Sequence, residues 1–333
     1  MLVVAAVVGP DPSAALDDRP QVWSNTWAHV NSVALVAMAD RERAGLGGVL
    51  QCVTWQATMP AISDVTMPIA SYEHADFPVA ELGAVKKDLR ISVCIPARDE
   101  EGTVGPIVEA VRRELVERVG LVDELLVVDD RSDDATAAVA FAAGARVVAV
   151  SDLDDWAEAK AGAATRGKGE AMRRGLAASS GDIVVFLDAD VENFNVHFVT
   201  GLVGPLLFRP DTMLVKACYR RPLGSSPTGG GRVTELVARP ALALLFPELA
   251  GVVQPLAGEV AVRREALVGL ELAGGYGVEL AMLIDVSRRF GVTSIAQVDL
   301  DVRAHRNRPL HELAPQARDV LRVALSRAGV EVG

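Results

Sequence analysis

Two aspartates, Asp188 and Asp190, follow directly after a short apolar run over residues 182–187. Such a run is typical of a buried strand, so both carboxylates are expected where a strand meets a loop. Carboxylates two residues apart at that point can divide their work between the ribose of a nucleotide and a hard divalent cation that bridges its diphosphate. Because D-x-D sequences are also common in solvated turns, the spacing alone leaves both interpretations open.

Two further motifs combine glycines with a cation. Lys168 lies between glycines at the start of a predicted helix over residues 168–179, which fits either a simple helix start or a phosphate contact. Residues 228–235 (TGGGRVTE) place three glycines ahead of another helix, where unpaired N–H groups can face an anion. Arg232 can clamp a phosphate or carboxylate through two hydrogen bonds, and Thr234 can add a hydroxyl. This second motif favours an anion site over a flexible linker.

The C-terminal part supplies a histidine and two isolated acids. His305 follows a predicted strand over residues 294–302 and has arginines around it between positions 303 and 308, which would suit a multiply anionic substrate. Glu259 and Glu279 interrupt otherwise hydrophobic segments. Burying an unpaired carboxylate is costly, so each of these acids is expected to be either paired or functional.

A parallel sheet is the element that can bring these groups together. Strand-like runs at residues 91–96, 124–128, 146–150 and 182–187 alternate with helical segments, which predicts an α/β fold with helices on both faces of the sheet. Polar clusters follow the first, second and fourth of these strands, and the carboxyl ends of parallel strands are where open α/β sheets bind ligands. No G-x-G-x-x-G follows a strand and no G-x-x-x-x-G-K-[ST] occurs, so neither a dinucleotide fold nor a P-loop is supported.

Composition excludes several classes of partner. The 333 residues carry a formal net charge of −11, which disfavours general binding of nucleic acid or of an anionic membrane. The 3 cysteines are far apart and form neither a disulfide framework nor a zinc motif, so a reducing cytoplasm is expected. No apolar stretch is long enough to span a membrane, and the opening MLVVAAVVG lacks the basic residues of a secretory leader. Residues 1–85 show no sustained period and are predicted to be a poorly ordered or accessory extension.

From residue 91 to about residue 329, the chain resembles the retaining glucosyl-3-phosphoglycerate synthases, which are sugar-nucleotide-dependent glycosyltransferases of the GT-A fold. The stretches that carry the resemblance are ISVCIPARDEE, GKGEA, SGDIVVFLDAD, TGGGRVTELVARP, GYGVEL and VRAHRNRPL. The fourth and the last are long and specific, whereas the D-x-D and the first strand occur across the fold. The resemblance implies a Rossmann-like, mostly parallel α/β sheet, with a nucleotide-sugar-binding half over residues 86–220 and a C-terminal acceptor-binding extension over residues 221–333.

The resemblance also implies a role for each matching position. The nucleotide sugar would be bound by Pro96, Ala97, Arg98, Glu100, Asp130, Lys168, Asp188 and Ala189, which moves Lys168 from a phosphate to the uracil and ribose side. The phosphate and carboxylate of 3-phosphoglycerate would be held by Gly230, Gly231, Arg232, Thr234 and Asn307. Asp190 and His305 would bind Mg²⁺ or Mn²⁺. Glu279 would position the sugar, and the backbone carbonyl of Leu256 would lie near the anomeric carbon.

The implied reaction transfers glucose from UDP-glucose to the 2-hydroxyl of 3-phosphoglycerate with retention, in a homodimer. Asp99 and Asp130 stand where the family usually has Asn and Ser, and the loop between Pro222 and Thr228 is shorter than usual. These departures leave open GDP-mannose as the donor, as in mannosyl-3-phosphoglycerate synthases. Two more functions stay open, which are an inverting transferase acting on a lipid phosphate or a polysaccharide, and a catalytically inactive sugar-nucleotide-binding protein.

Overall fold

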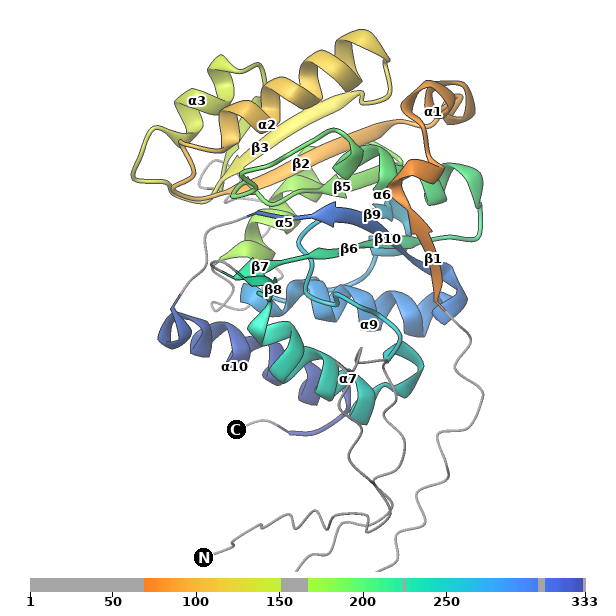
Figure 1. The fold of residues 1–333 in the computed structure, drawn as a ribbon, viewed down its shortest axis with the longest axis vertical. Helices are drawn as coiled ribbons and strands as arrows, with labels where there is room; N and C mark the ends of the chain where they lie inside the picture. Colours follow the sequence, from red (N-terminus) through yellow and green to blue (C-terminus); the bar gives the residue numbers. More distant parts are fainter. Residues whose placement is uncertain (1–68, 151–166, 224–225, 305–308, 332–333) are drawn as a thin grey trace, which may run out of the picture. The chain divides into compact units, whose positions relative to one another are not determined.

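An eight-stranded sheet organises the residues that this computed structural model describes, which are 69–150, 167–223, 226–304 and 309–331 (Figure 1). The strand order is β1-β10-β6-β9-β5-β2-β3-β4. All neighbouring strands are parallel except β9, which runs antiparallel to both β5 and β6. The strands are β1 Ala70–Glu73, β2 Ile91–Ala97, β3 Glu124–Asp129, β4 Arg146–Ala149, β5 Ile183–Phe186, β6 Leu214–Arg220, β9 Val260–Arg263 and β10 Ile295–Val302.

Helices cover both faces of the sheet. They are α1 Val79–Lys86, α2 Val104–Val111, α3 Thr136–Ala142, α5 Lys168–Ala178, α6 His197–Phe208, α7 Arg239–Leu245, α8 Arg264–Leu267, α9 Val278–Phe290 and α10 Leu310–Arg327. Two π-helical turns, Arg112–Arg118 and Thr234–Ala238, extend α2 and lead into α7, and short 3₁₀ turns occupy His74–Asp76, Pro247–Leu249, Gly275–Gly277 and Val292–Ser294. A separate hairpin pairs β7 Pro222–Leu223 with β8 Ser226–Gly229.

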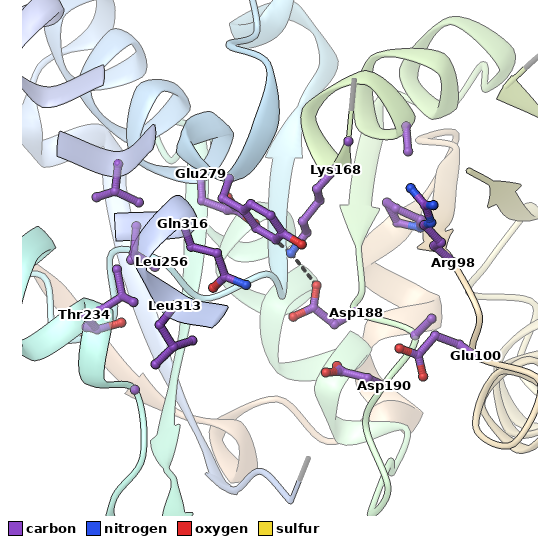
Figure 2. A pocket seen from close by; sticks show the side chains of 18 of the residues that line it. Arg98, Glu100, Lys168, Asp188, Asp190, Thr234, Leu256, Glu279, Leu313 and Gln316 are labelled. Carbon is purple, nitrogen blue, oxygen red and sulfur yellow. Dashed lines mark hydrogen bonds and ion pairs between the residues drawn. The ribbon is translucent and has the colours of Figure 1, made fainter. Parts of the chain in front are cut away.

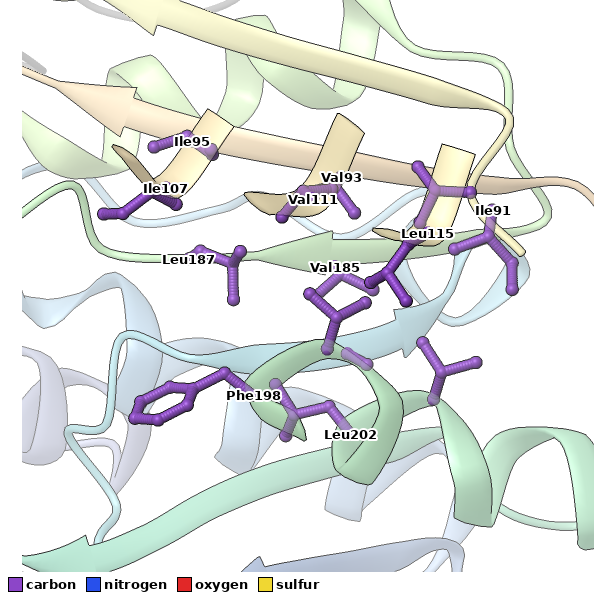
Figure 3. Close-up of a cluster of buried hydrophobic side chains, with 14 of the residues drawn as sticks. Ile91, Val93, Ile95, Ile107, Val111, Leu115, Val185, Leu187, Phe198 and Leu202 are labelled. Atoms are coloured by element: carbon purple, nitrogen blue, oxygen red, sulfur yellow. The ribbon is translucent and has the colours of Figure 1, made fainter. Parts of the chain in front are cut away.

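Alternate side chains of the central strands feed two hydrophobic cores. Ile91, Val93 and Ile95 of β2 pack with α2 and α6 on one face, as Figure 3 shows, whereas Cys94 belongs to the cluster on the other face. That second cluster contains residues of α7, α9 and α10, which lie together beyond the sheet in Figure 1. Because strands buried on both faces need apolar residues at every position, they read as continuous hydrophobic runs. This explains why these strands could be found from the sequence.

The predicted fold class is confirmed. The expected strands at 91–96, 124–128, 146–150, 182–187 and 294–302 correspond to β2, β3, β4, β5 and β10, and the expected helix over 168–179 corresponds to α5. The resulting sheet is mostly parallel, as the alternation of strands and helices indicated. No helix within the described ranges is both long enough and apolar enough to cross a membrane.

The sheet does not follow the expected segment boundaries. β1 and α1 lie inside residues 1–85, yet β1 pairs in parallel with β10 over four positions and forms one edge of the sheet. A strand of 4 residues is too short to show a sustained period of two, which is why no pattern in the sequence predicted it. Likewise, β9 and β10 come from the 221–333 half but pair with strands of the 86–220 half, so both halves share one sheet.

Candidate active site

A pocket of about 310 Å³ lies where β2, β3, β5, β6 and β10 end. Its lining residues come from the ends of these strands and the loops after them, from the segment after the β7–β8 hairpin, from the loop before β9, from the starts of α5 and α9, and from one face of α10. They are Pro96, Ala97, Arg98, Glu100, Asp130, Gly167, Lys168, Ala171, Asp188, Ala189, Asp190, Arg221, Gly231, Arg232, Val233, Thr234, Leu256, Tyr276, Glu279, Arg303, Leu313, Gln316 and Val320. The carboxyl edge of a parallel sheet is the expected place for a ligand site in such a fold.

Lys168 joins two carboxylates in the middle of this pocket. Its ammonium contacts Asp188 and lies 2.6 Å from Glu279 Oε1, and Figure 2 shows the lysine reaching from α5 toward Asp188. Burial by itself would lower the pKa of Lys168, but the charges of Asp188 and Glu279 outweigh it, so the pKa is raised above its ordinary value. The lysine therefore stays charged and fixes the position of both acids.

Arg303 holds both members of the D-x-D. Its Nη2 lies 2.8 Å from Asp188 Oδ2 and 2.7 Å from Asp190 Oδ1, and its Nε donates to Glu259 Oε1 at 2.8 Å. Burial would raise the pKa of Asp188, but the charges of Lys168 and then Arg303 outweigh it and hold that pKa well below its usual range. Asp188 is therefore an anion with both oxygens engaged.

Glu259 is the buried acid that the sequence predicted to be paired or functional. It is fully buried and paired, because it accepts hydrogen bonds from Arg303 and from the Tyr219 hydroxyl at 2.7 Å. Tyr219 in turn accepts a hydrogen bond from Arg221 Nη2 at 2.7 Å. This buried network supports Arg221 and Arg303, two of the arginines that line the pocket, because its carboxylate and its hydroxyl are both hydrogen-bonded to them.

Two glycines allow close approaches around these charges. A methyl group at Gly258 would lie 2.1 Å from Asp188 Oδ1, so the backbone before β9 packs directly against that carboxylate. A methyl group at Gly169 would lie 2.1 Å from the carbonyl oxygen of Ala273, which brings the start of α5 against the segment before α9. Because Gly169 has no side chain, α5 can approach this segment closely enough for Lys168 to reach Glu279.

The nucleotide edge is formed by the loops after β2 and β3. The carboxylate of Asp130 pairs with Arg131 Nη1 at 2.7 Å, and the Asp130 N–H donates to the carbonyl oxygen of Ala97 at 2.8 Å. Asp99 does not line the pocket; its Oδ1 accepts the N–H of Asp133 at 2.8 Å, and its φ is 54°. Of the two unusual carboxylates noted in the sequence, only Asp130 faces the pocket.

The glycine-rich motif lies on the opposite side of the pocket. Gly231, Arg232 and Thr234 line it, whereas the Gly230 N–H donates to the carbonyl oxygen of Arg221 at 3.1 Å and Gly230 is not a lining residue. Figure 2 places Arg98 and Glu100 on one side of Asp188, and Thr234, Leu256 and Gln316 on the other. The pocket therefore has two distinct sides joined at Lys168 and Asp188.

The structure brings together most of the residues that the sequence selected. Every proposed donor residue lines the pocket, as do Asp190, Gly231, Arg232, Thr234, Leu256 and Glu279. His305 and Asn307 lie outside the described residues. The sequence missed Arg221, Tyr276 and the α10 residues Leu313, Gln316 and Val320. Arg221 directly follows the strand β6, so examining the residue after every strand could have identified it. The α10 residues belong to no motif that would mark them as site residues in the sequence.

Comparison with known proteins places this pocket in a family. The model of glycosyl transferase family 2 matches residues 92–233. A glucosyl-3-phosphoglycerate synthase of Mycolicibacterium paratuberculosis is 50% identical over 274 residues, which cover 80% of this chain and 81% of the relative. The chain belongs to the glucosyl-3-phosphoglycerate synthase family.

Solved structures of this synthase family have the same fold. A Mycobacterium tuberculosis glucosyl-3-phosphoglycerate synthase crystallised with Mn²⁺, UDP-glucose and phosphoglyceric acid is 48% identical, with a TM-score of 0.72, and the match covers 80% of this chain and 89% of that one. A second structure from the same organism, with Mg²⁺ and UDP, is 48% identical with a TM-score of 0.71, covering 80% of this chain and 88% of that one. These glucosyl-3-phosphoglycerate synthases support the GT-A fold and a glycosyltransferase activity for the chain.

Proposed function

We propose that this chain transfers glucose from UDP-glucose to the 2-hydroxyl of 3-phosphoglycerate, with retention and with the help of Mg²⁺ or Mn²⁺. The observation that carries the proposal is the pocket in which the D-x-D residues and the TGGGR motif face one another across Lys168. A donor and an acceptor bound on the two sides of that lysine would be held within reach of each other, which is the main requirement for a group transfer.

The donor side combines a polar rim with fixed charges. Pro96, Ala97, Arg98, Glu100 and Asp130 line the edge that would receive the base and ribose, and Asp188 and Ala189 lead from there to the diphosphate. Asp188 suits a ribose hydroxyl because it is held as an anion by Lys168 and Arg303 and can only accept hydrogen bonds. A relative 48% identical to this chain binds UDP-glucose, which supports the assignment of the donor.

The D-x-D fits a hard cation. Among the described residues, Asp190 is bonded through one oxygen, to Arg303, and its side chain is 33% exposed. Carboxylate oxygens are the ligands that Mg²⁺ and Mn²⁺ prefer, and one or two of them suffice when a diphosphate supplies the rest. We assign Asp190 and His305 to this ion, which when bound supplies positive charge beside the leaving diphosphate. Arg303 already neutralises part of the charge of Asp188 and Asp190.

The acceptor side carries the groups that an acidic three-carbon ligand needs. Arg232 and Thr234 line it together with Gly231, whose φ of 73° is in the left-handed region that glycine adopts readily. Arginine binds carboxylates and phosphates through two parallel hydrogen bonds. We assign these residues, together with Gly230 and Asn307, to 3-phosphoglycerate. Gly230 would contribute by shaping the loop that carries Gly231 and Arg232, since its own N–H already donates to the carbonyl oxygen of Arg221.

Glu279 is assigned to positioning the sugar. It is 4% exposed, and its carboxylate lies 2.6 Å from the Lys168 ammonium. A carboxylate held by an ion pair is a poor nucleophile but remains a good acceptor for sugar hydroxyls. Glu279 would therefore orient the glucose rather than attack it. We assign the backbone carbonyl of Leu256, another lining residue, to a position near the anomeric carbon. Retention, the homodimer and a cytoplasmic location stay predictions.

Product analysis tests this proposal. The chain is incubated with UDP-glucose, 3-phosphoglycerate and Mg²⁺, and the product is examined by proton NMR. We expect an α-glucoside at the 2-position of phosphoglycerate, since UDP-glucose is itself α-linked. A β-glucoside would refute retention while leaving the acceptor in place, and hydrolysis to free glucose without a glycoside would refute the acceptor.

A further inference from the structure

Two histidines and an aspartate meet outside the active site. His74 follows β1 in a 3₁₀ turn, His197 is the first residue of α6, and Asp301 lies near the end of β10. His74 Nε2 is 2.9 Å from Asp301 Oδ2, and the two imidazole rings stack with centroids 4.2 Å apart and planes at 25°. One ligand atom from each of the three residues lies within 4.8 Å of the others. Among the described residues, no other set of three or more histidines, cysteines or acids brings one ligand atom from each member this close together.

The spacing is close to that of a metal site. Zinc binds nitrogen and oxygen ligands at about 2.0–2.2 Å in a tetrahedron, which places the ligand atoms roughly 3.4 Å apart. Contacts of 2.9–4.8 Å reach that value through small side-chain rotations. His197 Nε2 also lies 3.3 Å from the carbonyl oxygen of Leu300, and a backbone carbonyl is the kind of partner that orients a ligating imidazole.

The surrounding charges favour a cation. Glu73 on β1 and Asp299 on β10 occupy directly opposite positions in the sheet, and the Asp301 N–H donates to Asp299 Oδ1 at 2.8 Å. Like charges opposite one another on neighbouring strands destabilise a sheet. Arg220 also reaches this group, but its Nη2 lies 4.0 Å from Asp301 Oδ1 with both side chains more than half exposed, so it offsets little of the negative charge.

We propose that His74, His197 and Asp301 form a binding site for a divalent transition-metal ion of the zinc class. Two imidazoles select Zn²⁺, Co²⁺ or Ni²⁺ over Mg²⁺, whereas the carboxylate-rich D-x-D takes the harder ions. Three protein ligands leave a position for water. The ion would join the 3₁₀ turn after β1 to α6 and β10, and so would hold the end of the edge strand against its neighbours. This site does not depend on the proposed transferase reaction.

Zinc titration of the full chain tests the proposal. Metal-free protein receives Zn²⁺ in a calorimeter with Mg²⁺ in excess to occupy the D-x-D, and Co²⁺ is added in parallel because tetrahedral Co²⁺ gives intense visible absorption. We expect one ion per chain, and a thermal unfolding temperature that rises with Zn²⁺. Asp301→Asn is the main variant, since Asp301 has a φ of 68°, a conformation that Asn tolerates as well as Asp.

The controls separate this site from adventitious binding. Loss of a supporting partner alone weakens metal binding by 10- to 100-fold, so loss of a ligand in Asp301→Asn or His197→Asn should weaken Zn²⁺ binding by roughly 100-fold or more. His311→Asn removes a histidine that is 82% exposed and outside the cluster, and it should bind Zn²⁺ like the wild type. The proposal is wrong if the wild type binds no Zn²⁺ in the micromolar range, or if Asp301→Asn and His197→Asn bind it as His311→Asn does.

Discussion

Gly258→Ala should displace the Asp188 carboxylate from its partners without substituting any charged residue. The added methyl group would lie 2.1 Å from Asp188 Oδ1 and 2.3 Å from Oδ2, whereas ordinary contact begins near 3.4 Å. The Asp188 carboxylate cannot rotate away freely, because Lys168 and Arg303 both hold it by ion pairs. Arg303 is itself fixed by its ion pair with Glu259. The carboxylate must therefore move by about 1 Å.

A displacement of that size has an expected effect on kcat/KM. Misplacing a substrate-binding group by 1 Å costs about 100-fold, so we expect kcat/KM for UDP-glucose to fall by about that factor. Initial rates are measured with the donor varied at saturating 3-phosphoglycerate, and thermal unfolding shows that the variant is folded. Gly83→Ala is the matched control, since its nearest atoms, both from Val119, lie 3.7 Å away, and alanine is favoured over glycine in the helix α1. If folded Gly258→Ala turns over within about threefold of Gly83→Ala, Asp188 does not hold the donor as described.

Three further changes report on the acceptor, the metal and a buried lysine. Arg232→Ala should raise KM for 3-phosphoglycerate by about 10- to 150-fold and that for UDP-glucose much less, and unchanged acceptor saturation would contradict the acceptor site. Asp190→Ala should abolish the Mg²⁺- or Mn²⁺-dependent turnover, and a metal activation curve equal to that of the wild type would refute its role. Burial lowers the pKa of Lys216 from 10.5 to about 8, so the unfolded chain binds more protons between these pH values. The free energy of unfolding in urea should therefore rise by about 3 kcal/mol from pH 8 to pH 10.5 in the wild type but not in Lys216→Met, and parallel curves would contradict this.

The sequence was most informative where burial acts locally. The apolar runs of β2 and β5 follow from their burial on both faces, and the polar residues after them follow from the direction of parallel strands. The motifs around Lys168 and Arg232 could be recognised because glycines mark close approaches and left-handed turns. Those residues line the pocket.

Other parts of the site depend on contacts that no local pattern records. Arg303 bonds Glu259, Asp188 and Asp190, which are 44, 115 and 113 residues away in the chain. Gln316 lines the pocket from an amphipathic helix whose sequence resembles any surface helix. The insertion of β9 between β5 and β6 is a property of the topology, since a four-residue strand carries no information about its neighbours.

The most direct test of the proposed reaction offers two donors in parallel. The full chain is incubated with 3-phosphoglycerate and Mg²⁺, with UDP-glucose in one series and GDP-mannose in the other, and the formation of glycosylated phosphoglycerate is followed by mass spectrometry. We predict product from UDP-glucose, with transfer from GDP-mannose far slower. Efficient transfer from GDP-mannose alone would contradict the assigned donor and direct attention to Asp130 at the nucleotide edge, and no transfer from either donor would contradict the proposed function.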